Sequence, residues 1–321
     1  MKKFQLIKST EPHAERKMFF VLFGYPGIGK TSLSFTMPGP VLHLDFDKGI
    51  DRAVQKKRPD YFSIEKFQDF SDFVNSEQFE ILISENSYKS VVIDTVGTLL
   101  DDYIAPALIA ESPKNGNRNG GLTLQGWGAL GTAFNNIKSR FQSLGLNICA
   151  VCHAKEEGDE SQKQVRLAVK GGSTDILYRN ADMIGLVYPY GKKRIVDFNP
   201  TELHIGKNIT GLPAMEIPNE TENEYDTFLE SVIEKCYAKM NQATESQKTF
   251  HAELGKWRDA LAKCETTNDF DVWAENLKKK ANQTLRNQLA KLFQDTIWER
   301  GFAYNKETGK VEERMPQTIE A

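Results

Sequence analysis

A glycine-rich stretch near the start of the chain has the residue types and spacing of a phosphate-binding loop. Residues 24–31 read Gly-Tyr-Pro-Gly-Ile-Gly-Lys-Thr and satisfy G-x-x-x-x-G-K-[ST] in full. In such loops successive backbone N–H groups face one anion. Lys30 is expected to reach the β- and γ-phosphates, and the Thr31 hydroxyl is expected to ligate Mg²⁺. The loop therefore predicts a nucleoside triphosphate site, with contacts from Gly24, Tyr25, Pro26, Gly27, Ile28, Gly29, Lys30, Thr31 and Ser32.

A second element of the expected site is an aspartate that ends an apolar run. Residues 91–93 (Val-Val-Ile) lead directly into Asp94. An aspartate at the end of a buried strand can hold Mg²⁺ through water, opposite the Thr31 hydroxyl, so that the metal bridges the triphosphate. We therefore predict ATP and Mg²⁺ as the ligands, with Thr31 and Asp94 at the metal.

The residue after Asp94 is Thr95, which has no carboxylate and cannot act as the general base. The base that would activate water must therefore come from another part of the chain. Asp45 and Asp47 stand at the end of another expected strand, and ligands of open α/β sheets bind at the carboxyl ends of strands. Alternation of side chains puts both carboxylates on one face, so either could orient water. We favour Asp47 over Asp45 as the base, and a structural role for both stays open.

The alternation of strand-like and helix-length segments predicts an α/β fold with a parallel sheet. The apolar runs are nearly continuous, which is typical of strands buried on both faces. The expected strands are residues 19–23, 41–45, 90–94, 146–152 and 183–188, followed by an edge hairpin of 194–198 with 202–205. Residues 112–121 and 155–172 are expected to be flexible loops, because the first is rich in Gly and Asn and the second is polar.

After residue 218 the chain becomes acidic and polar, and helical periodicity follows. Leu254, Trp257, Leu261 and Cys264 are spaced three, four and three residues apart, as on one face of an amphipathic helix. We therefore divide the chain into a core of residues 1–218, a linker or connecting helix of 219–240, and a C-terminal helical region of 241–321.

Composition narrows the class of the protein. The 321 residues carry a formal net charge of −3, so any contact with nucleic acid must come from local patches. No run reaches the ~18 apolar residues of a membrane span, and the basic start lacks the apolar segment of a signal peptide. We therefore predict a cytoplasmic protein with no membrane partner.

The cysteines raise one further pattern. Cys149, Cys152 and His153 match the C-x-x-C-H spacing of haem c attachment. Haem attachment requires export, and these residues continue an apolar run, so we predict a buried strand with two small apolar cysteines. With Cys236 and Cys264 as the other two, we expect no disulfide and no structural zinc.

Three segments resemble RecA-type recombinases. Residues 45–51 (Asp-Phe-Asp-Lys-Gly-Ile-Asp) resemble their acid-bearing second strand, whose middle acid is the general base, and residues 92–96 resemble their Walker B strand. Residues 171–182, which begin Gly-Gly-Ser, resemble the segment and helix after their second DNA-binding loop. The matches run in order over residues 18–215. They look most like bacteriophage RecA-like ATPases, which accompany single-strand annealing and recombination.

The resemblance implies a RecA-like P-loop NTPase core with a mainly parallel central sheet, followed by a C-terminal helical region. It implies an Mg²⁺-dependent ATPase that binds single-stranded DNA and promotes annealing or recombination. The subunits would form a homo-oligomer, as a ring or a filament, in the cytoplasm of a bacterial host. A single-stranded DNA-binding protein is an implied further partner.

The resemblance also assigns site residues. His153 stands where the family usually carries a polar Gln or Asn sensor, so it could hydrogen-bond the γ-phosphate or a water at Asp94, with a charge that changes near neutral pH. Lys207 stands in a Lys-Asn-Arg element that reaches a neighbour's nucleotide in DnaB- and RadA-type ring ATPases, although Ile209 replaces the arginine. The family usually has Glu at the position of Asp47. The predicted catalytic residues are Lys30, Asp47, Asp94 and His153.

The two DNA-contacting loops of the family map onto residues 109–123 and 155–170. Cations in such loops neutralise phosphates and give salt-dependent affinity. Four acidic residues dilute the positive charge of the second loop. The predicted DNA contacts are Lys114 and Arg118 in the first loop, and Lys163, Arg166 and Lys170 in the second.

Two other functions stay open. A ring-forming helicase or loader would use the same core as a motor, but it would need arginines acting on a neighbour's site, and the missing arginine at position 209 speaks against it. A nucleotide switch of the KaiC type would bind protein partners in place of DNA. Salt-titrated binding of single-stranded DNA, with and without ATP, would separate the switch from the recombination ATPase.

Overall fold

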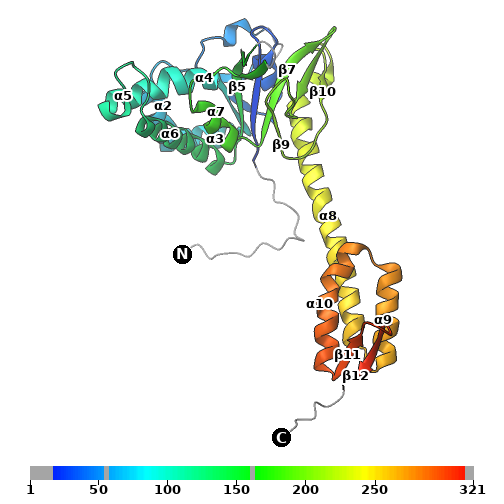
Figure 1. The fold of residues 1–321 in the computed structure, drawn as a ribbon. Coiled ribbons are helices and arrows are strands. Elements are labelled where there is room, and N and C mark those ends of the chain that lie inside the picture. Colours follow the sequence, from blue (N-terminus) through cyan, green and yellow to red (C-terminus); the bar gives the residue numbers. More distant parts are fainter. Residues whose placement is uncertain (1–16, 54–57, 160–162, 315–321) are drawn as a thin grey trace. The chain divides into compact units, whose positions relative to one another are not determined.

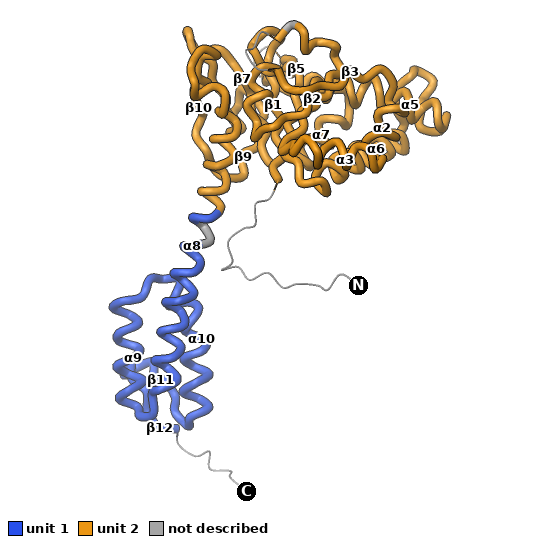
Figure 2. The backbone as a smooth tube through the Cα atoms, turned by 180° about the vertical axis from the view of Figure 1, so that it is seen from behind, with its two compact units in different colours: residues 1–13, 241–321 blue, residues 14–240 orange. Residues whose placement is uncertain are grey.

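The protein divides into two compact units. The computed structural model describes residues 17–53, 58–159 and 163–314. The first unit runs to Met240 and the second begins at Asn241 (Figure 2). Helix α8 (Phe228–Ala262) contributes to both units. No helix in the described part of the chain is long and apolar enough to cross a membrane.

A ten-stranded, mostly parallel sheet forms the centre of the first unit (Figure 1). Its strands lie in the order β10-β8-β7-β1-β5-β4-β2-β3, with β6 paired to β5 and β9 paired to β7. The strands from β3 to β7 along this order are parallel, whereas β6, β8, β9 and β10 pair in the antiparallel sense. Their bounds are β1 Phe19–Gly24, β2 Val41–Asp45, β3 Asp60–Ser63, β4 Ser90–Asp94, β5 Asn147–Glu157, β6 Gln164–Leu167, β7 Met183–Tyr190, β8 Lys193–Asp197, β9 Lys207–Asn208 and β10 Met215–Ile217.

Helices cover both faces of this sheet, so the predicted α/β fold with a mainly parallel sheet is confirmed. Phe19, Val21 and Phe23 of β1 pack into one apolar cluster, and Phe20 and Leu22 pack into the other. Burying one large apolar side chain of this kind stabilises the folded state by roughly 1.5–3 kcal/mol. The first cluster is covered by α2 Phe67–Asn75, α3 Glu77–Glu85, the π-helical turn η2 Leu99–Ile104, α5 Ala105–Glu111, α6 Leu124–Ser143 and α7 Ser173–Asn180.

The second cluster is closed by α1 (Lys30–Ser34) and the first turns of α8. Leu229, Val232 and Cys236 of α8 are buried in it. Thr36, just after α1, also fixes the start of α8, because its Oγ1 accepts a hydrogen bond from Leu229 N at 3.0 Å. The segment 219–240, predicted as a linker or connecting helix, contains the start of α8 and belongs to the first compact unit, which extends past residue 218.

The second unit is helical, as the periodicity predicted. Helices α9 (Thr267–Lys280) and α10 (Gln283–Glu299) pack with the end of α8 around a separate apolar cluster. Thr266 and Asp269 form a capping box that starts α9. A hairpin of β11 (Phe302–Asn305) and β12 (Lys310–Glu313), which the sequence reading missed, completes the unit.

The predicted edge hairpin of residues 194–198 with 202–205 is wrong. Strand β8 pairs with β7 on one side and with β10 on the other, so both of its edges are occupied. Residues 202–205 form no strand, and His204 makes only an isolated bridge with Val165. The turn between β7 and β8 lies at Gly191, whose φ of 62° suits a glycine.

The two segments predicted as irregular loops are more ordered than expected. Residues 113–115 form a 3-10 turn, and the buried Asn115 donates from Nδ2 to Leu108 O at 2.9 Å. Asn117 Oδ1 accepts the N–H groups of Asn119 and Gly121, so asparagine side chains replace a regular ladder there. In the second segment, β5 continues to Glu157 and pairs with β6. Residues 160–162 of this segment lie outside the described residues.

Two glycines of α6 provide a matched test of this packing. A Cβ at Gly126 would lie 2.2 Å from Asn115 O, whereas a Cβ at Gly128 meets nothing within 4 Å. We expect Gly126→Ala to destabilise the protein by about 2 kcal/mol, because backbone of the 113–115 turn must shift. Gly128→Ala should stabilise it by about 0.5–1 kcal/mol through helix propensity. Denaturant unfolding measures both, and equal effects of the two substitutions would contradict the close approach.

Candidate nucleotide-binding site

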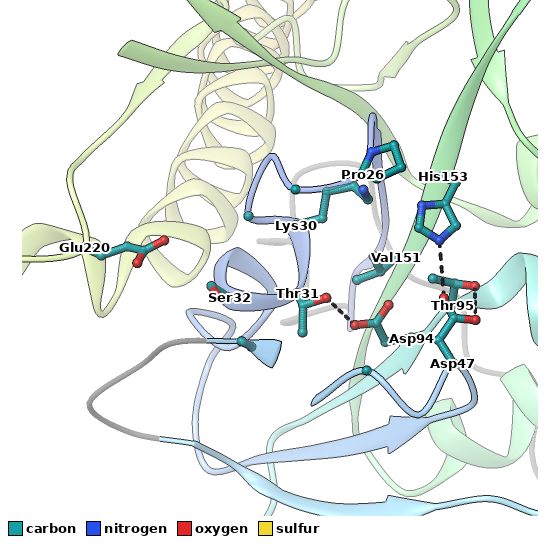
Figure 3. A pocket seen from close by; sticks show the side chains of 14 residues that line it. Pro26, Lys30, Thr31, Ser32, Asp47, Asp94, Thr95, Val151, His153 and Glu220 are labelled. Carbon is teal, nitrogen blue, oxygen red and sulfur yellow. Dashed lines mark hydrogen bonds and ion pairs between the residues drawn. The ribbon is translucent and has the colours of Figure 1, made fainter. Parts of the chain in front are cut away.

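The register of the parallel strands brings the candidate residues to one edge of the sheet. Gly24 of β1 lies opposite His153 of β5, Asp94 of β4 opposite Val151, and Asp45 of β2 opposite Asp94. A pocket of about 520 Å³ opens at these carboxyl ends (Figure 3). It is lined by Pro26, Gly27, Gly29, Lys30, Thr31, Ser32, Asp47, Gly49, Ala53, Asp94, Thr95, Val151, His153 and Glu220.

The glycine-rich loop has the conformation that its glycines permit. Gly27 and Gly29 have φ values of 80° and 88°, which L side chains rarely adopt, and α1 begins directly after Gly29. Lys30 is only 5% exposed, and its Nζ donates to Tyr25 O at 3.0 Å. Burial lowers the pKa of Lys30, and the charge of Asp94 works in the opposite direction. A buried ammonium group inside a loop whose glycines have positive φ is suited to bind an anion such as a phosphate.

Thr31 and Asp94, the residues predicted at the metal, are in direct contact. Thr31 Oγ1 donates to Asp94 Oδ2 at 2.6 Å. Burial raises the pKa of Asp94 to about 6, the charges of Asp47 and Asp45 add to this, and the Thr31 hydrogen bond opposes it. A carboxylate whose charge is costly in the empty protein is stabilised when a cation arrives, so the pair fits a divalent metal.

The chemistry of this donor set suits Mg²⁺ in particular. Among the described residues, no group of three or more His, Cys, Asp and Glu side chains gathers as a metal cage. Thr31 and Asp94 therefore offer two oxygens, and phosphates and water would supply the others. Such mixed, oxygen-only coordination is what Mg²⁺ prefers.

Asp45 and Asp47 have separate environments, and the strand alternation from which a shared face was predicted does not extend to Asp47. The strand ends at Asp45, whose two carboxylate oxygens accept the backbone N–H groups of Gly49 at 3.0 Å and Ile50 at 3.1 Å. Asp45 is 2% exposed and does not line the pocket, whereas Asp47 does. Both oxygens of Asp45 are thus engaged in holding the loop that presents Asp47.

Three side chains hold Asp47 in the pocket. His153 Nε2 lies 3.2 Å from Asp47 Oδ2, Thr95 Oγ1 donates to Asp47 Oδ1 at 3.1 Å, and Thr98 Oγ1 donates to the same oxygen. The interaction with His153 lowers the pKa of Asp47, and the two threonines lower it further against the effect of burial. The carboxylate is therefore ionised and oriented at neutral pH. Sequence reading identified Asp47 and His153 but missed both threonines.

A buried histidine next to Asp94 was also missed. His43, in the middle of β2, is fully buried, and its Nε2 lies 3.8 Å from Asp94 Oδ2. Burial lowers the pKa of His43 to about 4, so its ring is neutral at physiological pH. The signal was present in the sequence, because a histidine inside an otherwise apolar strand is unusual.

Glu220 reaches the pocket from the segment before α8, opposite the side of His153 (Figure 3). Arg194 of β8 pairs with it at 3.2 Å, and the guanidinium lies over the ring of Tyr225. Arg194 Nη1 is also 3.5 Å from Ile28 O in the glycine-rich loop. No local motif marks these residues, because they meet only in the folded sheet.

The predicted DNA contacts lie outside this pocket. Lys163 pairs with Glu156 at 3.7 Å, Arg166 with Glu157 at 3.8 Å, and Lys170 with Asp102 at 3.5 Å. Lys114 and Arg118 are exposed on the other segment, and no hydrogen bond or ion pair within the described residues joins them to the first group. Lys170 lines a neighbouring pocket together with Thr95, Thr98 and His153.

Lys207, predicted to contact a neighbour's nucleotide, is engaged within its own chain. Its Nζ donates to Tyr178 O at 2.9 Å and lies 5.7 Å from the centre of the Tyr178 ring. Residue 209 offers only an exposed isoleucine.

Cys149 and Cys152 lie on opposite faces of β5, each in a different apolar cluster. Burial raises the pKa of Cys149 above its usual range and that of Cys152 to about 12. Both thiols are therefore protonated core side chains, which is the role that the apolar run predicted.

Comparison with known families agrees with this geometry. Residues 16–210 match the family described as AAA domain, which is more than half of the chain. The chain therefore belongs to this family of P-loop ATPases, whose members bind nucleotide, typically with Mg²⁺, and generally hydrolyse ATP. A search of curated proteins gives no match.

The buried charge of Asp94 leads to a prediction about the empty protein. A carboxyl held at a pKa of about 6 in place of 3.8 costs the folded state on the order of 2–3 kcal/mol at pH 7.5. Asp94→Asn should therefore melt at a higher temperature than the wild type without ligand, yet gain little from Mg²⁺ and ATP. Thermal melts with and without ligand measure both effects.

The pH dependence of this difference has a definite sign. Between pH of about 6 and about 4, folded wild-type protein binds a proton at Asp94 that the unfolded chain does not bind. Protonation removes the cost of the buried Asp94 charge in this window. The difference in melting temperature between Asp94→Asn and the wild type should therefore shrink as the pH falls. Equal melting temperatures of the two empty proteins at pH 7.5 would contradict the assignment.

Proposed function

We propose that the protein is an Mg²⁺-dependent ATPase that uses Asp47 as its general base. The observation that supports this most directly is the position of Asp47 in the pocket, oriented by His153, Thr95 and Thr98 next to the Thr31–Asp94 pair. Asp47 Oδ1 is occupied by the two threonines. The oxygen shared with His153, Oδ2, is therefore the one that would face a water molecule.

The chain's own residues would act as follows. The backbone of residues 24–31 and the Lys30 ammonium bind the phosphates. When bound, Mg²⁺ would neutralise charge on the β- and γ-phosphates from the side of Thr31 and Asp94. Asp47 would accept the proton of the attacking water. His153 would orient Asp47 and could also hydrogen-bond the γ-phosphate. The nucleoside would then extend toward Ser32 and Glu220, at the other end of the pocket.

Asp47→Asn should retain ATP affinity and lose turnover, because it removes the base and leaves the phosphate and metal contacts intact. General bases contribute about 10²–10⁴-fold, so we expect a fall in kcat of that size. Lys30→Ala should instead abolish binding. Steady-state kinetics with a fluorescent-nucleotide binding assay separate the two effects. A wild-type kcat in Asp47→Asn would refute the role of Asp47.

We further propose that hydrolysis is coupled to single-stranded DNA in a homo-oligomer. Support comes from the resemblance to RecA-type recombinases and from the continuity of β5, which carries His153 and then pairs with β6. Lys170 and His153 line one pocket beside Asp47's threonines. A strand bound along the β5–β6 hairpin would therefore lie close to groups that hold the base.

Replacing Lys114 and Arg118, or Lys163 and Arg166, by Ala should weaken binding of single-stranded DNA. The slope of log affinity against log salt should flatten by roughly 0.7 per lost phosphate contact. The double variant Lys89→Ala with Lys235→Ala is a charge-matched control, because it removes two lysines away from both loops. Lys89 lies at the amino end of β4, and Lys235 lies on α8. Loop variants that bind as tightly as the control would exclude these contacts.

The surface ion pairs favour one second candidate, a nucleotide switch that binds protein partners. Three of the five predicted DNA cations, Lys163, Arg166 and Lys170, are paired with carboxylates of their own chain. Such exposed pairs contribute only about 0–1 kcal/mol each, so DNA could still displace them. A protein that binds ATP and shows no salt-dependent affinity for single strands would be this switch.

A further inference from the structure

A second pocket lies in the C-terminal unit and is lined by residues of α9, α10 and β11. The β11–β12 hairpin lies at one end of these helices (Figures 1 and 2). Its volume is about 260 Å³, below the range of about 300–1,000 Å³ that is typical of small-molecule sites. The pocket can therefore hold a single side chain. Its apolar lining includes Trp273, Leu277, Ala290, Phe293 and Tyr304.

Two aromatic side chains, Trp273 and Phe293, form the floor of this pocket, and their rings are buried against each other. Trp273 and Phe293 stack on each other, with centroids 5.2 Å apart and an interplanar angle of 5°. They are 5% and 8% exposed. The indole Nε1 of Trp273 donates to Trp257 O at 3.1 Å, so its polar group is satisfied within the unit. The floor that these two side chains form is apolar and offers no open ring face on which a nucleic-acid base could stack. Tyr304, the third aromatic residue of the lining, is 43% exposed and meets the Phe293 ring at 75°, with the ring centroids 6.3 Å apart.

The charge at the rim has one sign. Lys278 and Arg286 are the charged residues that line the pocket, and no carboxylate lines it. The neighbouring Lys279, outside the lining, is paired with Glu275. Within the described residues, by contrast, no ion pair involves Lys278 or Arg286, and Arg286 Nε is buried without a hydrogen-bond partner. Nε itself is covered, but Arg286 as a whole is only half-buried, so no carboxylate within the described residues competes with an acceptor that reaches its guanidinium from outside.

We propose that this pocket docks an acidic peptide segment of a partner protein, by one apolar side chain flanked by carboxylates. The apolar side chain enters between α9 and α10, and the carboxylates bind Arg286 and Lys278. Arginine presents paired N–H donors that match a carboxylate, which gives such contacts both strength and direction. The choice of a peptide over single-stranded DNA rests on the buried ring faces of Trp273 and Phe293. The proposal does not depend on the nucleotide site.

The test uses the full-length protein and a fluorescein-labelled octapeptide with one Phe among aspartates. We expect saturable binding by fluorescence anisotropy, weakened at least about tenfold by Arg286→Gln and by Lys278→Gln. Ala290→Phe should also weaken it, because Ala290 is exposed and a larger side chain there fills the pocket. Lys291→Gln, an exposed lysine of α10 outside the lining, is the matched control and should bind as the wild type does.

Changes in the peptide provide a test that does not rely on the folding of any variant. Replacing its Phe by Ser, or its aspartates by lysines, should abolish binding. Binding that survives either change, or that is equal in Lys278→Gln and Lys291→Gln, would overturn the proposal. Competition by oligo-dT that is lost in Arg286→Gln would overturn it in favour of nucleic acid. Peptide binding that appears only after removal of residues 315–321 would overturn it in favour of the chain's own C-terminus as the occupant.

Discussion

In-register pairing of parallel strands is the constraint on which the rest of the nucleotide site depends. Gly24, His153, Val151 and Asp94 occupy facing positions on β1, β5 and β4, so groups about 130 residues apart in sequence end at one edge. A slip of one residue would turn every side chain of a strand to the other face. Both faces of these strands pack closely, so a slip would exchange side chains of different size and shape between the two clusters and leave voids and clashes in each.

The site contains two charged groups whose ionised forms are disfavoured by burial. Burial disfavours the charge of Asp94 and that of Lys30, and His43 places a neutral, fully buried ring beside the same aspartate. Groups that a ligand will satisfy are therefore held at some cost to the fold, as is common at functional sites. Asp47 is the opposite case, because three side chains stabilise its ionised form before any substrate arrives. The charge of Asp94 is thus stabilised when a cation binds, whereas Asp47 is held in its ionised form by its neighbours alone.

The sequence predicts the buried parts of the structure well and the marginal parts poorly. Strands β2 and β4 have the predicted bounds, and β1 differs by one residue, because continuous apolar runs leave little choice. Strand β3 was missed since all four of its residues are exposed. Strand β6 is only four residues long and alternates polar with apolar side chains inside a polar segment. Among site residues, motifs identify Lys30, Thr31 and Asp94. Glu220 and Arg194 carry no such signal, because they lie 26 residues apart in sequence and meet only when β8 and the segment after β10 are folded.

The positions of the four cysteines make the protein a reporter of its own opening. All four are free and buried: Cys149 and Cys152 on the two faces of the sheet, Cys236 in the first turns of α8, and Cys264 in the C-terminal unit. A thiol reagent can reach them only when the surrounding structure opens, so labelling rates measure local unfolding free energies. Mass spectrometry of individually labelled peptides would thus read the stability of each unit separately, in the unmodified wild-type chain.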